Sequence, residues 1–381
     1  MKHSGLKIVK PFIVALWFSL LFLPLKGIAA ALVAFFVLSL LFVSVSFLSR
    51  YKETCARKWE RLSSEIYRTR VFSPLMLPVF RYPVLLFFFF TLPFLAGDYF
   101  VDVAILVGIY IILALGLNVV VGFAGLLNLG FVAFYAIGAY TYALLNTRFG
   151  FGFWSALPFS VVLTSAAGFL LAIPALRLRG DYLAIVTLGF GEIVRLVLNN
   201  WDSVTRGPNG ISGISRPAIF SLSLGSISSF YYLVLVFVLV TVFVTRRVYS
   251  SKIGRAWTAL REDEIAASVI GINTTLYKLY AFAFGAFWAG LAGALFAGKM
   301  QFVSPESFTF MESVLILCMV ILGGLGSISG VILGVFILVM LPEMLREVQM
   351  YRMLALGIGL VLLMIFRPQG LLGGKSVSLR S

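Results

Sequence analysis

Histidine, cysteine and charged residues are all scarce in this chain. Its 381 residues include one histidine, His3, and two cysteines, Cys55 and Cys318. Zinc sites and histidine-based catalysis need such side chains in groups, and a disulfide framework needs an even set of cysteines at suitable spacings. The sequence therefore predicts no metal site, no disulfide framework and no catalytic residues.

The shortage of charge determines the expected environment. Only 12% of the residues are charged, 61% are hydrophobic, and the mean hydropathy is +1.04. A soluble domain carries roughly 25% charged residues, so most of this exterior must face lipid. Because backbone groups in lipid must be hydrogen-bonded within their own segment, the chain is predicted to be an all-α transmembrane bundle.

Apolar runs long enough for a bilayer, about 20 helical residues each, predict a polytopic bundle of about 10–12 hydrophobic segments, some broken or re-entrant. Residues 1–48 predict a hydrophobic hairpin, although the first run also fits a cleaved signal peptide, and 49–82 form a basic linker. Residues 374–381 are a tail. The remaining spans are expected at 83–97, 103–121, 124–146, 155–176, 182–198, 231–248, 279–301, 313–323, 328–342 and 351–366.

The positive charge has a topological explanation. A net charge of +15 would suggest a nucleic-acid partner in a soluble protein, but cytoplasmic loops of membrane proteins also collect Lys and Arg. If 49–82 is cytoplasmic and the spans alternate, 22 of the 30 Lys and Arg residues lie on the inner side. This distribution predicts cytoplasmic N- and C-termini, a lipid bilayer as the partner and no nucleic acid.

Two glycine-rich stretches, 116–138 and 323–330, interrupt apolar runs. Broken helices are tolerated at membrane depth where they line a cavity, and corresponding breaks in two halves of a chain indicate a transport path. The alternative is that these glycines only permit close helix packing. On the first interpretation, the candidates for a pathway or gate are Asn118, Asn128, Thr187, Glu192 and Arg195.

Glu192 and Arg195 stand three residues apart in a predicted span, close enough to pair on a helix. An unpaired charge at the bilayer centre costs about 2.5–3.5 kcal/mol. The pair therefore either lines or gates a pathway, or forms a structural ion pair that faces another subunit.

Residues 249–278 form a charged, Ala-rich segment without proline, which predicts a short helix. Ile265, Val269 and Ile272 fall on one helical stripe. The segment could dock into a cytoplasmic partner, or it could be an ordinary solvated loop.

This segment resembles the coupling loop of ABC-importer permeases, whose pattern is Glu-Ala-Ala, three residues, then Gly. Ala266, Ala267 and Gly271 match, whereas Ile265 stands at the Glu position and Glu264 precedes it. The resemblance implies that an ATPase couples to these residues: Arg255, Arg261, Glu262, Asp263, Glu264, Ala266, Ala267 and Gly271.

Four further stretches resemble the branched-chain amino acid permeases, most closely those of the LivM type. They are 115–140, 177–192, 302–310 and the C-terminal RPQGLL at 367–372. The resemblance covers residues 83–373, the expected permease domain. The polar outer loop 199–230 is similar too, although Thr205-Arg206-Gly207 replaces the usual Thr-Gly-Gly.

The resemblance implies an importer of branched-chain amino acids in a bacterial inner membrane, working by alternating access. Its implied partners are a second, LivH-like permease subunit, two ATPase subunits that use ATP, and an extracytoplasmic binding protein, which would dock at Asp202, Arg206 and Asn209. The outer loop could equally be a simple connection.

This chain contains no Gly-x4-Gly-Lys-Ser/Thr run, so it is predicted to bind no cofactor and to be no enzyme. The rival hypotheses are a transporter or channel that works alone, and a scaffold without transport.

Overall fold

The computed structural model describes residues 89–93, 97–176, 178, 180–219, 222–223, 226–344, 357, 361 and 370–371. The predicted hairpin 1–48, the linker 49–82 and the tail 374–381 lie outside the described residues. The predicted span 351–366 is described at two positions only, and 83–97 is described only in part.

The described residues confirm the predicted all-α membrane bundle. Four helical segments are long and apolar enough to cross a membrane: α3 Asp98–Leu117 with its π-helical extension η2 Asn118–Phe123, α5 Phe153–Ala175, α8 Ile227–Tyr249 and α11 Thr274–Met300. The bundle also contains α4 Phe131–Phe149, α6 Asp181–Asn200, α12 Phe310–Gly323 and α13 Ile328–Met344.

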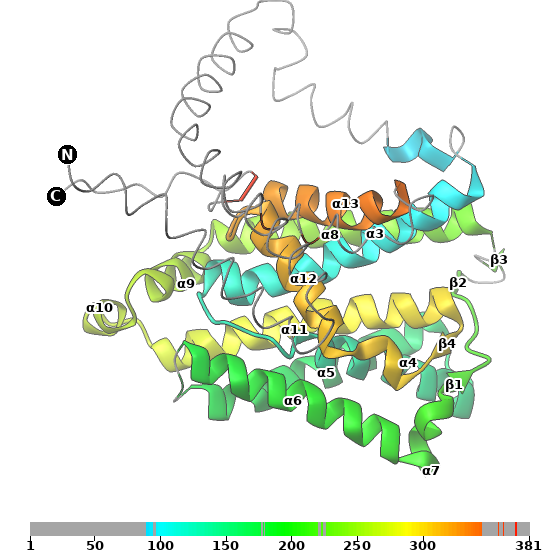
Figure 1. The fold of residues 1–381 in the computed structure, drawn as a ribbon, viewed down its shortest axis with the longest axis horizontal. Helices are drawn as coiled ribbons and strands as arrows, with labels where there is room; N and C mark the ends of the chain where they lie inside the picture. The colour runs from blue at the N-terminus through cyan, green and yellow to red at the C-terminus, as the bar shows by residue number, and fades with distance from the viewer. Residues whose placement is uncertain are drawn as a thin grey trace, which may run out of the picture. The chain divides into compact units, whose positions relative to one another are not determined.

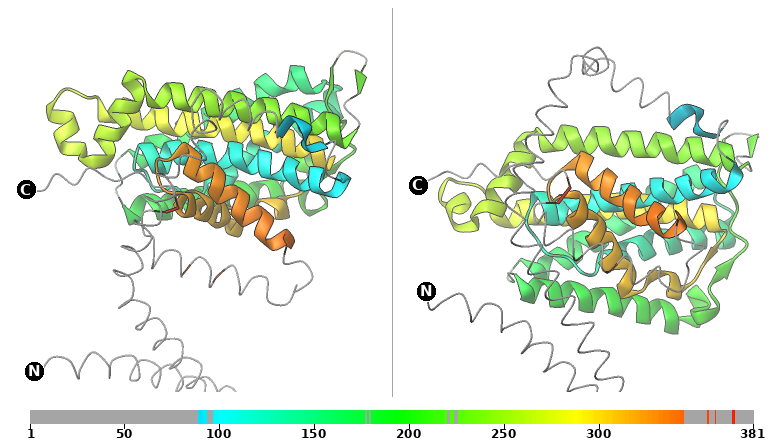
Figure 2. Two further views of the ribbon diagram at one scale, coloured as in Figure 1. Left: turned by 90° about the horizontal axis from the view of Figure 1, so that it is seen from above. Right: turned by 45° about the horizontal axis from the view of Figure 1, so that its top comes forward.

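Both predicted interruptions are real breaks in helices. After η2 the chain is non-helical over residues 124–130, so the span predicted at 124–146 is wrong at its start, and α4 begins only at Phe131. The second break separates α12 from α13 at residues 324–327. In Figures 1 and 2, α12 crosses obliquely over the neighbouring long helices.

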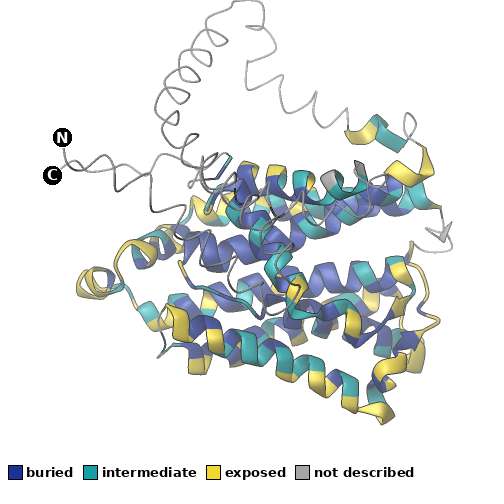
Figure 3. Ribbon diagram, viewed as in Figure 1, coloured by how far each residue is buried: buried dark blue, intermediate teal, exposed yellow. Residues whose placement is uncertain are grey.

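The centre of the bundle is α11, which packs on α3, α4 and α5 and is largely buried (Figure 3). Small residues allow this close approach. A Cβ atom at Gly138 of α4 would lie 2.5 Å from the Cα atom of Gly290. Glycine-mediated packing therefore explains the contact of α4 with α11. The glycines of this chain thus serve both interpretations, packing here and helix breaks at 124–130 and 324–327.

Short elements mark the two ends of this bundle (Figure 1). At one end lie α9 Lys252–Glu262 and α10 Glu264–Val269. At the other end, β1 Ile211–Ser212 pairs antiparallel with β4 Phe302–Val303. The remaining short elements are α7 Asp202–Thr205, η3 Gly207–Asn209, η4 Pro305–Phe308, and the hairpin of β2 Ala218–Ile219 and β3 Leu222–Ser223.

Candidate functional site

The element α10 has a defined start and end because of two residues. The Asp263 carboxylate accepts hydrogen bonds from the backbone N–H groups of Ile265 and Ala266 at 2.8 and 3.0 Å, an N-terminal cap. At the other end, the Ile272 N–H bonds to Ala267 and the Gly271 N–H bonds to Ser268. This is a Schellman motif whose left-handed residue, Gly271, has φ +88°. The glycine of the sequence pattern is thus explained by backbone geometry.

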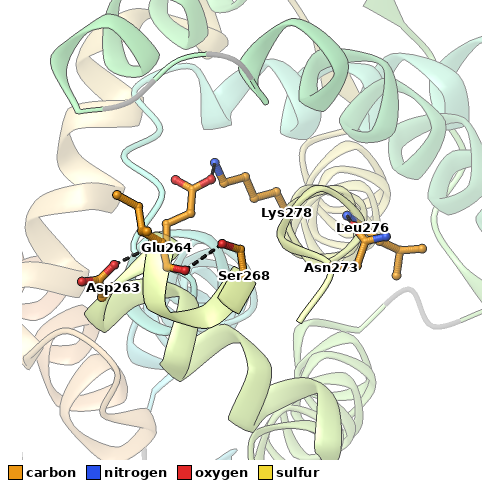
Figure 4. Close-up of polar contacts among 7 residues, drawn as sticks. Asp263, Glu264, Ser268, Asn273, Leu276 and Lys278 are labelled. Carbon is orange, nitrogen blue, oxygen red and sulfur yellow. Dashed lines mark hydrogen bonds and ion pairs between the residues drawn. The ribbon is translucent and has the colours of Figure 1, made fainter. Parts of the chain in front are cut away.

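Two contacts attach the α9–α10 unit to α11. Figure 4 shows Glu264 pointing toward Lys278, and the Nζ–Oε1 distance is 2.6 Å. The Lys278 side chain is only 4% exposed, so this carboxylate neutralises a nearly buried ammonium. The indole N–H of the buried Trp257 donates to the Tyr277 carbonyl at 2.8 Å. Glu264 is therefore engaged within its own chain.

The outward face of α10 is apolar. Ile265, Val269 and Ile270 are 64%, 81% and 72% exposed. The predicted stripe is thus wrong in one member, because Ile272 lies beyond the end of the helix and is half-buried, whereas Ile270 is exposed. Ala267, by contrast, is buried. Among the predicted coupling residues, Ala266, Arg255, Glu262, Arg261, Asp263 and Gly271 are exposed.

The polar residues of the first break hold its loop in place. Asn118 is fully buried, and its Oδ1 accepts from the Gly326 N–H of the second break at 2.9 Å. Asn128 accepts from the Gly130 N–H, and Thr187 of α6 accepts from the Leu129 N–H at 3.0 Å. These three of the five predicted pathway residues are enclosed within the subunit, where they order the break.

Glu192 and Arg195 form the predicted ion pair on α6. The Nη2–Oε2 distance is 2.8 Å, and each side chain is 34% exposed. The pair lies beside exposed Ile193 and Leu196 on the outer side of this subunit. The structure does not bring it together with Asn118 or Asn128.

The loop at the opposite end of the bundle has a defined shape, as its turn residues predict. The Thr205 hydroxyl donates to the Leu198 and Trp201 carbonyls. Arg148 donates to the carbonyl oxygens of residues 203 and 204. The three predicted docking residues, Asp202, Arg206 and Asn209, are all exposed.

Sequence reasoning missed a carboxylate inside the bundle. Glu312, in the first turn of α12, accepts a hydrogen bond from the Tyr110 hydroxyl near the middle of α3. The predicted span began at residue 313 and so placed Glu312 outside the membrane. The signal was present in the sequence, since an acidic residue flanked by Phe310, Met311 and a long apolar run is rare and marks a polar contact.

Membrane-length helices, two broken helices and a capped α9–α10 unit at one end are the features of a polytopic membrane transport protein. The chain belongs to the family of branched-chain amino acid transport system permease components, whose family model matches residues 99–366.

Named relatives agree with this family. The chain is 52% identical over 303 residues to the high-affinity branched-chain amino acid transport system permease protein LivM of Salmonella typhimurium, covering 74% of this chain and 71% of the relative. The identity and coverage are the same for LivM of Escherichia coli K12. The high-affinity branched-chain amino acid transport system permease protein LivH of Escherichia coli K12 is 27% identical over 290 residues, covering 70% of this chain and 92% of the relative. No solved structure matches this chain.

Proposed function

We propose that this chain is the membrane-spanning permease subunit of an ATP-driven importer that carries branched-chain amino acids by alternating access. Its partners would be a LivH-like second permease, two separate ATPase subunits that use ATP, and an extracytoplasmic binding protein. The similarity to both LivM and LivH, each named a permease of a high-affinity system, supports a pair of related permeases.

The observation that carries the ATPase coupling is the exposed apolar face of α10. Ile265, Val269 and Ile270 stand on a helix that is capped at both ends and attached to α11 through Lys278. A rigid apolar face with a polar rim is the form that partner-docking helices take. It is also positioned to move α11, the helix at the centre of the bundle.

The charge distribution supports the orientation. The Lys- and Arg-rich segments, including 246–278, favour the cytoplasmic side, and this is the end at which α9 and α10 lie. Asp202, Arg206 and Asn209 would then face outward, where a binding protein delivers substrate. Cytoplasmic termini would follow from the same assignment, whereas the bacterial inner membrane is proposed from the similarity to LivM of two bacteria.

Val269→Glu tests the docking surface in the complete co-expressed transporter. A charge placed in the middle of an apolar contact should weaken ATPase docking by about 2 kcal/mol or more, as at interface hot spots. Co-purification of the ATPase subunits and hydrolysis stimulated by the binding protein should both fall.

The matched control is Phe149→Glu, an exposed apolar residue at the other end of the bundle, which should leave ATPase docking unchanged. Undiminished docking of the Val269→Glu variant would rule out this face of α10. Uptake that persists without any ATPase would favour a transporter that works alone, and a complex without uptake would favour a scaffold.

A further inference from the structure

The side chain of Arg261, which is 36% exposed, reaches from α9 to the end of η2. Arg261 lies in the last turn of α9, and its Nη1 donates a 2.6 Å hydrogen bond to the backbone carbonyl of Gly122. The two residues are 139 positions apart in the sequence. A second nitrogen, Nη2, lies 3.4 Å from Glu262.

The Gly122 carbonyl belongs to the end of a helix. It lies in η2, immediately before the non-helical residues 124–130. The last carbonyl groups of a helix have no partner within it and carry partial negative charge. A guanidinium from another element is a favourable partner for such a group. Arg261 therefore caps the broken end of α3 from outside.

The second break meets the same point. The Gly326 N–H donates to Asn118 of η2 at 2.9 Å. A Cβ atom at Gly326 would lie 3.2 Å from Arg261 Nη1 and 3.3 Å from the Gly122 carbonyl oxygen. The α9–α10 unit and both helix breaks thus meet at the Arg261 guanidinium.

Glycine also lets the backbone of the first break pack on the stem of this arginine. A Cβ atom at Gly125 would lie 2.6 Å from Arg261 Cγ and 3.2 Å from its Cα. A displacement of α9 by even 1 Å must therefore either move residues 122–125 or break these contacts, because close-packed groups transmit displacement.

We propose that Arg261 is a positioning residue that couples movement of the α9–α10 unit to both helix breaks, so that ATPase closure is converted into rearrangement of the transport path. The inference rests on the proposed ATP-driven import, and adds the route by which the docking surface reaches the membrane. A planar, permanently charged guanidinium suits this role, since it can hold a carbonyl while its stem packs on glycine.

The test compares Arg261→Ala and Arg261→Lys with wild type in the reconstituted complete transporter. Two quantities are measured: ATP hydrolysis stimulated by the binding protein, and labelled leucine uptake per ATP hydrolysed. For Arg261→Ala, labelled leucine uptake per ATP hydrolysed should fall by about tenfold, within the usual range of coupling between sites, and this ratio is compared at whatever hydrolysis rate the variant retains. Arg261→Lys, which keeps the stem and the charge, should lose less. The control, Lys252→Ala, removes an exposed cation from the start of the same helix and should match wild type.

Unchanged uptake per ATP in Arg261→Ala would overturn the proposal. If that variant does not assemble, Arg261→Lys decides, and wild-type coupling in it would overturn the proposal equally. Failure of the proposed function would look different, because wild type itself would then show no ATP-dependent uptake.

Discussion

Arg206 occupies the left-handed region of backbone conformation, with φ +61°, where glycine is the usual residue. This is the position at which the resemblance to the branched-chain amino acid permeases implies Gly. The turn keeps its shape because the Thr205 hydroxyl holds two carbonyl oxygens and also accepts from the Gly207 N–H at 3.3 Å. The sequence shows the departure from the pattern, but only the structure shows that an arginine adopts the left-handed conformation here, at a cost of about 1–2 kcal/mol.

Gly271→Ala tests the end of α10 at the same scale. Alanine at φ +88° should destabilise this end of α10 by about 1 kcal/mol, because a Cβ atom disfavours the left-handed conformation. Hydrogen exchange of residues 264–272 should be several-fold faster in the purified transporter.

Gly189→Ala is the matched control, since a Cβ atom there meets nothing within 4 Å and the residue lies inside α6. Hydrogen exchange of residues 264–272 in the Gly189→Ala variant should equal that of wild type. Equal protection of α10 in the Gly271→Ala variant would show that the Schellman geometry does not limit its stability.

At the scale of elements, the sequence predicts a helix in residues 249–278 but does not show where it divides. The run from Ala256 to Ala267 is rich in helix formers, and nothing in its propensity requires an interruption. The division occurs at Asp263, whose backbone is extended (φ −158°) so that its carboxylate can cap α10. Capping by the Asp263 side chain sets the boundary between α9 and α10. In the sequence alone, one aspartate inside a run of helix formers is weak evidence for such a boundary.

The ion pair of α6 gives a second element-scale prediction. Glu192 and Arg195 bond to each other and lie on an exposed apolar face, which favours a structural pair that faces the proposed second subunit over a gate. The single change Glu192→Arg leaves two like charges and should reduce recovery of the assembled complex and uptake together.

The exchanged pair, Glu192→Arg with Arg195→Glu, should restore both to within about twofold of wild type, because it keeps the i, i+3 attraction. A gate that requires the carboxylate at residue 192 would instead give an assembled complex that remains inactive. Measuring assembly and uptake on the same preparations separates the two roles.

At the scale of the whole molecule, the sequence predicts both helix breaks but not their meeting. Glycine and asparagine within 116–138 and glycine within 323–330 are local signals of the two helix breaks. The bond from Gly326 to Asn118 joins positions 208 residues apart, and no periodicity or propensity encodes such a pairing. The same holds for Arg261 and Lys278, which composition marks only as loop cations, although each has a defined partner on another element.

Transport of labelled leucine into proteoliposomes tests most directly whether this chain works as the permease of an ATP-driven importer. The complete transporter would be reconstituted with the binding protein outside and ATP inside, and compared with the same permease pair lacking the ATPase subunits. We expect uptake only when binding protein, ATP and ATPase subunits are all present. Leucine accumulation by the permease pair alone would contradict it.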